Sequence, residues 1–271
     1  MAGERVQHGA GETGGEPRAE GAGGARGTES AGSAEGAGEL LPAHVYARDR
    51  NWPKYFDTMA NLPARPTLMK ALERFELEEQ ASGKAAGLTG RQAISADAAV
   101  QRRAIDLGCG EGRDTAELLR RRWSVVAIDG SREGLDRVEK RVRAGCDERA
   151  LTRLELVLRS FEEIGAVGLP GASLVNASFA LPFCPPRAFA GLWGRIVECL
   201  EPGGRFAGQF FGDRDAWAGL PDRTHHTRAE VLALLAAGFE VESLEEDERG
   251  PTPGATIGKC WHVFHVVAKR R

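Results

Sequence analysis

Apolar and polar positions alternate with two different periods along most of the chain. Short apolar runs predict strands, and these lie at residues 103–107, 123–128, 154–158, 172–178, 205–211, 239–244 and 260–268. Stretches with apolar residues three and four positions apart predict helices, at residues 66–80, 113–122, 131–144, 186–200 and 227–236. Strands that alternate with helices predict an α/β fold, with a mostly parallel sheet, right-handed crossovers and helices on both faces.

The beginning of the chain differs in composition from the rest. Residues 1–40 hold 12 of the 35 glycines, many alanines and glutamates, and no aromatic residue. Such a segment cannot bury enough apolar surface to offset the entropy lost on ordering. We therefore expect residues 1–43 to form a disordered tail.

Residues 44–100 form a second part, with weaker patterning. The segment 44–62 has no clear period, is predicted to be irregular, and contains a cluster of aromatic side chains, Tyr46, Trp52, Tyr55 and Phe56. Because this cluster lies next to the tail, we expect it to fold over a binding site as a lid. Pro66 opens the predicted helix, and residues 81–100, rich in small residues, predict a loop. Residues 101–271 then form one α/β domain.

The most informative stretch is residues 104–115, Ala-Ile-Asp-Leu-Gly-Cys-Gly-Glu-Gly-Arg-Asp-Thr. An apolar run ends in Asp106, and Gly108, Gly110 and Gly112 lead into a helical pattern. This order of strand, glycine turn and helix is typical of the first unit of a nucleotide-binding α/β domain. Glycines allow a ligand to lie against backbone, because no Cβ stands in the way. The stretch predicts an adenosine-containing cofactor.

A second carboxylate narrows the choice of cofactor. Asp129 ends the next predicted strand, 23 residues after Asp106, where it can accept hydrogen bonds from both hydroxyls of a ribose. A dinucleotide fingerprint needs Gly or Ala at the sixth position of the glycine motif, but Arg113 stands there. Asp106 and Glu111 would also repel a pyrophosphate. They suit S-adenosylmethionine (SAM), which carries an ammonium and a sulfonium group.

These motifs together resemble the class I SAM-dependent methyltransferases over residues 50–271. The resemblance rests on Asp-Leu-Gly-Cys-Gly-Glu-Gly-Arg-Asp-Thr, on Asp129, on the stretch that begins at Asn176, and on Leu-Glu-Pro-Gly-Gly-Arg at residues 200–205. The glycine motif is similar to that of the tellurite-resistance methyltransferase group and its small-molecule relatives. The resemblance implies a Rossmann-like seven-stranded sheet with an antiparallel last strand, and transfer of a methyl group. Two alternatives stay open, a nicotinamide-dependent oxidoreductase and a non-catalytic SAM-binding protein.

Ligands of such sheets bind beyond the carboxyl ends of the strands. This rule selects the residues that we expect to bind the cofactor, which are Asp106, Gly108, Cys109, Gly110, Asp129, Gly130, Phe161 and Asn176. Phe161 is expected to stack on the adenine or to staple the following turn. Cys109 is expected to be a small residue beneath the cofactor that contributes its backbone N–H group. Asn176 is expected beside the methyl group, with burial at a strand end as the alternative.

Methyl transfer needs little from the protein beyond positioning, since the sulfonium is a good leaving group. We name Asn176 and His225 as candidate catalytic residues. His225 is expected to act as a base or orienting group, with a role at the helix start beside Thr227 as the alternative. Pro182, Phe179 and Phe183 predict an apolar wall for a small organic acceptor. Arg65 is assigned either to the carboxylate of the cofactor, or to an anionic acceptor, or to the surface.

Charge and cysteine content limit partners and location. The tail carries seven Glu and three Arg, a net charge of −4, and the whole chain has a net charge of −3. The rest of the chain therefore has a net charge of about +1, which is too small for the basic surface that binds nucleic acid. Five cysteines without a Cys-x-x-Cys pair argue against a disulfide framework and against a zinc site. Apolar runs are too short to cross a membrane. We expect a cytoplasmic enzyme that is a monomer or a weak dimer and acts on a small molecule.

Overall fold

The computed structural model of the chain describes residues 41–85, 102–251 and 257–271. Almost all of the predicted tail and most of the predicted loop at 81–100 lie outside the described residues. These described residues belong to the compact unit Leu40–Arg271.

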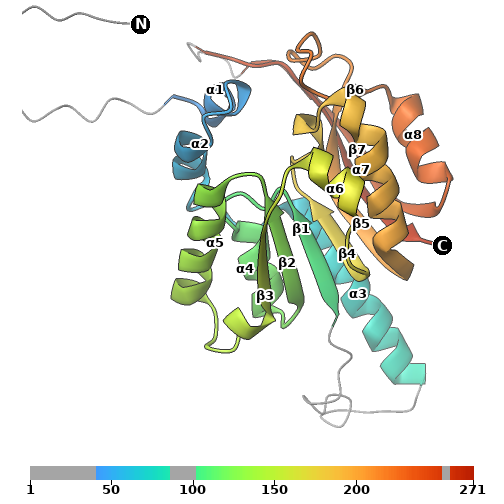
Figure 1. The fold of residues 1–271 in the computed structure, drawn as a ribbon. Helices are drawn as coiled ribbons and strands as arrows, with labels where there is room; N and C mark the ends of the chain where they lie inside the picture. Colours follow the sequence, from blue (N-terminus) through green and yellow to red (C-terminus); the bar gives the residue numbers. More distant parts are fainter. Residues whose placement is uncertain (1–40, 86–101, 252–256) are drawn as a thin grey trace, which may run out of the picture. The chain divides into compact units, whose positions relative to one another are not determined.

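Within the described residues, one mixed sheet forms the centre of this unit (Figure 1), with strand order β3-β2-β1-β4-β5-β8-β7. The strands are β1 (Arg103–Leu107), β2 (Ser124–Asp129), β3 (Leu154–Leu158), β4 (Ala172–Ala177), β5 (Leu200–Gly212), β6 (His225–His226), β7 (Phe239–Arg249) and β8 (Trp261–Arg270). Strands β3, β2, β1, β4 and β5 are parallel, β8 is antiparallel to both β5 and β7, and the short β6 pairs with the end of β5. The predicted parallel sheet with an antiparallel last strand is confirmed.

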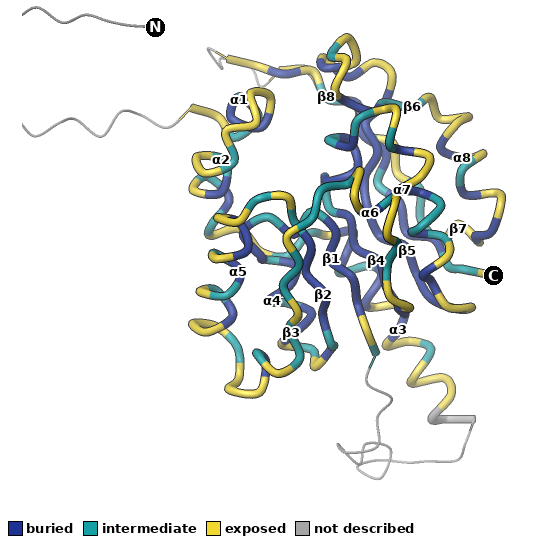
Figure 2. The backbone as a smooth tube through the Cα atoms, viewed as in Figure 1, coloured by how far each residue is buried: buried dark blue, intermediate teal, exposed yellow. Residues whose placement is uncertain are grey.

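Helices cover both faces of the sheet, as expected from the alternation of elements. They are α1 (Ala43–Arg48), α2 (Trp52–Met59), α3 (Pro66–Ala85), α4 (Arg113–Arg120), α5 (Arg132–Gly145), α6 (Phe161–Val167), α7 (Pro186–Cys199) and α8 (Arg228–Ala236). Apolar side chains of α3, α4 and α5 form one buried cluster with one face of the sheet, and those of α6, α7 and α8 form another with the opposite face. The central strands are therefore buried on both sides (Figure 2).

Two helical regions differ from the sequence-based expectation, β6 is an additional strand, and β5 and β7 are longer than predicted. The segment 44–62 is wrongly predicted as irregular, because it contains α1 and α2. The Asn51 side chain caps α2 by accepting a hydrogen bond from the N–H of Lys54 at 3.4 Å, and Pro53 follows near the helix start. The short helix α6 is absent from the prediction. A capping box formed by Ser160 and Glu163 begins it, a signal too local for an apolar period to reveal.

Candidate functional site

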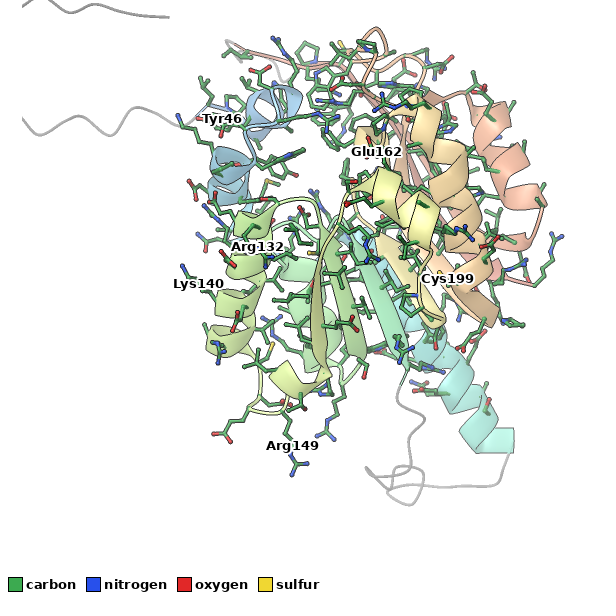
Figure 3. All side chains as sticks on the ribbon, viewed as in Figure 1. Tyr46, Arg132, Lys140, Arg149, Glu162 and Cys199 are labelled. Carbon is green, nitrogen blue, oxygen red and sulfur yellow. The ribbon has the colours of Figure 1, made fainter. Side chains whose placement is uncertain are left out.

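A cavity of about 320 Å³ lies at the carboxyl ends of the first strands of the sheet. One side is formed by the loops after β1 and β2 and by the start of α6, where Glu162 lies (labelled in Figure 3). The other side is formed by α2, by the segment before α3 and by the segment after β4. The cavity is within the size range of small-molecule sites, and it lies where an open parallel sheet binds ligands.

The glycine loop after β1 lies tightly between neighbouring segments. Gly108 has a φ of 68°, and a Cβ placed on it would lie 2.5 Å from the Cβ of Ala180. Gly110 has a φ of 55°, and its Cβ would lie 3.2 Å from the ring of Phe56 in α2. Both positions therefore require glycine, for conformation at each and also for space at Gly108. The loop brings its main chain directly to the cavity.

The backbone N–H groups of this loop are occupied within the protein. The N–H groups of Gly108 and Cys109 both donate to the carbonyl of Ile128, at 2.8 and 3.1 Å. The N–H of Cys109 thus already has a partner in this structure, and its contribution to ligand binding stays a prediction. Cys109 lines the cavity as a small buried residue, and burial raises the pKa of its thiol.

Asp129, at the end of β2, is held rigidly at the cavity. Its Oδ2 accepts a hydrogen bond from the N–H of Gly110, and its Oδ1 accepts one from the N–H of Ser131, each at 2.8 Å. Burial raises the pKa of this carboxyl, and the backbone donors oppose that shift. Each oxygen keeps a second lone pair, so the carboxylate can accept further hydrogen bonds from a ligand.

A buried network joins two more carboxylates behind the glycine loop. The amide nitrogen of Asn176 donates to Asp106 at 2.9 Å and to Asp114 at 3.0 Å, and Thr115 donates its hydroxyl to Asp106 at 2.5 Å. Asp114 also accepts the backbone N–H of Arg65 at 2.8 Å. Burial and the neighbouring Asp114 raise the pKa of Asp106 to about 7.

The structure places Asn176 differently from the direct ligand contact that the sequence suggested. Its side chain is completely buried, it does not line the cavity, and both of its amide hydrogens have partners in the network. Asn176 is buried because its amide, at the end of a strand and beside two carboxylates, donates a hydrogen bond to each of them and so reduces their mutual repulsion. The geometry gives Asn176 a positioning role, which matches the burial alternative.

The remaining predicted cofactor residues meet at the same cavity. Asp106, Gly108, Cys109, Gly110, Asp129, Gly130 and Phe161 all line it. Phe161 is the first residue of α6, and its ring lies 3.5 Å from the position that a Cβ on Gly108 would occupy. Asp114 lines the cavity too, although the sequence analysis did not name it as a site residue. An acidic residue in the first turn of the helix after a glycine loop is the signal that indicates it.

Four aromatic side chains form the opposite side of the cavity, and we call them the aromatic wall: Trp52, Tyr55, Phe179 and Phe183. The rings of Trp52 and Phe183 meet edge to face, with centroids 5.0 Å apart. Of the predicted apolar wall, Phe179 and Phe183 line the cavity, whereas Pro182 is buried and does not line it. The aromatic cluster at 46–56 thus contributes three lining residues, since Phe56 lines the cavity as well.

Two guanidinium groups accompany the aromatic wall. That of Arg65 lies over the ring of Phe179, 4.4 Å from its centroid, and its Nε is buried with no hydrogen-bond partner among the described residues. Arg50 also lines the cavity, and its side chain donates to Asp222 at 3.1 Å and to the carbonyl of Phe183 at 3.3 Å. Burial and the nearby Arg113 lower the pKa of Arg65.

His225 lies outside the cavity, contrary to its nomination as a catalytic residue. It belongs to β6, and its Nε2 lies 3.9 Å from Asp215, which is also ion-paired with the buried Lys259. The lysine is surrounded by aromatic rings, with its Nζ 3.6 Å from the centroid of Trp261. The pairing of β6 with the end of β5 draws His225 into this cluster, and sequence spacing contains no sign of that pairing.

Part of the chain matches a known protein family. The methyltransferase-domain family matches residues 104–204. The chain is similar to carboxy-S-adenosyl-L-methionine synthases of Shewanella, at 31% identity to one from Shewanella sp. and 32% to that of Shewanella oneidensis, each over 103 residues. Those alignments cover 36% of this chain, which spans 40% of the length of these relatives.

Solved structures share the fold. The chain resembles TehB from Haemophilus influenzae with a TM-score of 0.55 and 13% identity, over 81% of this chain and 67% of that one. It also resembles the 1,6-didemethyltoxoflavin-N1-methyltransferase of Burkholderia thailandensis, with a TM-score of 0.50 and 20% identity, over 85% of this chain and 91% of that one. No helix in the described part of the chain is long and apolar enough to cross a membrane.

Proposed function

We propose that this chain is a class I SAM-dependent methyltransferase that transfers the methyl group of SAM to a small organic acceptor, a proposal that the match of residues 104–204 to the methyltransferase-domain family supports. One observation carries the proposal. The glycine loop and the carboxylates of Asp106 and Asp129 come together on one side of a cavity whose other side is aromatic. A donor with an adenosyl sugar and two positive charges matches the first side, and an apolar acceptor matches the second.

The residues at the cavity fit this cofactor. Asp129 would accept the ribose hydroxyls, since both of its oxygens are held in place and each retains a free lone pair. Phe161 would contact the adenine, and Asp106 would lie toward the ammonium group. The Nε of Arg65, which is buried without a hydrogen-bond partner among the described residues, supports an additional contact with a negatively charged group of a ligand. When bound, SAM supplies an activated methyl group on a sulfonium, which is a good leaving group.

The contribution of the chain to the reaction is mainly placement and exclusion of water. The Asn176 bridge holds Asp106 and Asp114 apart and so determines where the negative charge stands. The aromatic wall excludes water from the acceptor and restricts its orientation. Holding the reactants in line in a dry site accounts for much of the rate of such a displacement. A protein base is required only for an acceptor that must lose a proton.

The N-terminal helices α1 and α2 act as the cover of the site in this proposal. Arg223 donates to the backbone carbonyl of Arg48 at 2.8 Å, and Arg50 donates to Asp222 at 3.1 Å. These contacts fasten the junction of α1 and α2 to the segment that precedes β6. Phe56 completes the cover by lying against Gly110.

Calorimetric titration with S-adenosylhomocysteine (SAH), SAM and NADH tests the proposal. We expect SAH and SAM to bind and NADH not to bind. Asp129→Ala should weaken SAH binding about a hundredfold, because hydrogen bonds to a charged group are lost. Glu133→Ala is the matched control, since Glu133 is an exposed carboxylate on α5 outside the cavity. Unchanged SAH affinity in Asp129→Ala would contradict the assignment of the donor side.

Turnover separates the enzyme from a non-catalytic SAM-binding protein. Purified protein with SAM and a panel of small acceptors should produce SAH, and the omission of acceptor should abolish production. Binding of SAM without turnover on any acceptor would favour the regulatory alternative.

All five cysteines are free thiols in the structure, which supports a reducing, cytoplasmic location. Size-exclusion chromatography should show a monomer or a weak dimer.

A further inference from the structure

The conformation of Phe179 in the aromatic wall is unusual. Its φ is 53°, a left-handed conformation that is a genuine outlier for a bulky side chain. Backbone strain of this kind persists only where the surroundings enforce it, and such positions gather at binding sites. Arg50, which also lines the cavity, has a φ of 54°. Two of the three non-glycine residues with positive φ in the described chain therefore stand at this cavity.

A buried glutamine holds Phe179 in this conformation. Its N–H donates to the Oε1 of Gln209 at 2.8 Å, and the Nε2 of Gln209 donates to the hydroxyl of Thr67 at 2.7 Å. Gln209 and Thr67 are both buried, on β5 and α3. The main chain of Phe179 is thereby anchored to two buried side chains, and the Arg65 guanidinium lies against its ring. This arrangement supplies a preorganised aromatic surface, which costs a ligand no ordering of the protein side chain.

Two guanidinium groups lie at the aromatic wall itself. Arg50 and Arg65 both line the cavity beside it, and the Arg65 guanidinium lies 4.4 Å from the centroid of the Phe179 ring. The other charged lining groups carry both signs, and Asp114 among them accepts the backbone N–H of Arg65. An ammonium group stacked on Phe179 would therefore approach the Arg65 guanidinium, and this like-charge contact disfavours a cationic ring at that position.

We propose that the acceptor is a flat aromatic molecule without positive charge, which stacks on the aromatic wall beside Arg65 and Arg50. This inference rests on the proposed function and names the substrate class of the same site. Flat rings gain most from contact with an immobilised aromatic surface, because offset and edge-to-face packing both need planar partners. A neutral or negatively charged ring also fits the two guanidiniums.

The test uses the full-length protein saturated with SAH, so that only the acceptor side stays open. Isothermal titration compares four matched probes: 2-naphthol, its saturated analogue decahydro-2-naphthol, 2-naphthoate and the 2-naphthylmethylammonium ion. We expect 2-naphthol and 2-naphthoate to bind at least about fivefold more tightly than the saturated and the cationic probes. Equal affinity for the planar and saturated probes, or tighter binding of the cation, would overturn the proposal.

Variants locate the binding in the aromatic wall. Phe179→Leu and, independently, Trp52→Leu should weaken 2-naphthol binding about fivefold while SAH affinity stays within about twofold. Phe189→Leu is the matched control, because Phe189 is a buried aromatic residue outside the cavity. If both wall variants bind 2-naphthol as tightly as the control does, the aromatic wall is not the acceptor surface.

These results distinguish failure of the proposed function from failure of the acceptor assignment. If SAH itself does not bind to the wild-type protein, the proposed function fails. If SAH binds normally but the four probes are not discriminated, only the acceptor assignment fails.

Discussion

The two sides of the cavity are built in different ways. The donor side comes mostly from one continuous stretch, residues 106–131, and much of its shape depends on backbone conformation and backbone hydrogen bonds. The acceptor side is gathered from residues 50–65 and 178–185, and side chains form it. The donor side carries the lining carboxylates together with Arg113 and Arg159, whereas the acceptor side carries most of the aromatic rings and the guanidiniums of Arg50 and Arg65. If the proposed function holds, this contrast leads us to expect that cofactor binding depends on the backbone and that the choice of acceptor depends on side chains.

After Asp129→Ala, the largest expected effect follows from the backbone of the donor side. Gly108→Ala places a Cβ against Ala180 in a left-handed conformation, so we expect SAH affinity to fall about thirtyfold in calorimetric titration. Gly171→Ala is the control, because nothing lies within 4 Å of a Cβ there. If Gly108→Ala kept full SAH affinity, the donor side would not depend on its backbone.

Removal of the carboxylate bridge comes next. Asn176→Leu leaves Asp106 and Asp114 without a shared donor, and we expect the free energy of unfolding to fall by about 1.5 kcal/mol in urea denaturation. Ser178→Ala, which removes the hydroxyl that donates to Asn176, should cost less. A large loss of turnover with unchanged stability would instead restore a direct catalytic role for Asn176.

The pH dependence of cofactor binding separates the two sides electrostatically. The folded, ligand-free protein keeps Asp106 protonated up to a pKa of about 7, above the ordinary value of 3.8. The folded state thus binds more protons than the unfolded state between these values, and the stability contributed by Asp106 falls as pH rises through this window. A positively charged ligand favours the ionised carboxylate. SAM affinity should therefore rise roughly fivefold from pH 6 to 7.5.

Asp106→Asn is the control for this pH effect. In that variant the affinity for SAM is expected to be lower throughout, with a flatter dependence on pH. A slope identical to that of the wild type would assign the titration to another group.

The smallest effect concerns a residue on neither side. His225→Gln should change turnover by less than about twofold, because His225 lies in the cluster of Asp215 and Lys259 and not at the cavity. Steady-state kinetics at saturating SAM measures this. A tenfold drop in kcat without loss of thermal stability would show that β6 approaches the acceptor during the reaction.

Much of the fold follows from local signals. The strands and the long helices have clear apolar periods, and β3 and α8 agree closely with expectation because turn and capping residues delimit them. Helices α1, α2 and α6 were missed, since they are short and owe their position to caps and to contacts with distant segments. The strand β6 is equally invisible, because two residues carry no period.

The sequence by itself determined the donor side. Its glycine turn and its two strand-end carboxylates lie close together in the sequence, so their local pattern is enough to recognise them. Only the tertiary structure decided the rest. It showed that Asn176 donates to two carboxylates and that the N–H of Cys109 donates to the carbonyl of Ile128. It also showed that the ring of Trp52 packs against Phe183, which lies more than a hundred residues away in the sequence. The physical reason is that side-chain partners are selected by the packing of whole elements against one another, and this packing is a property of the entire core.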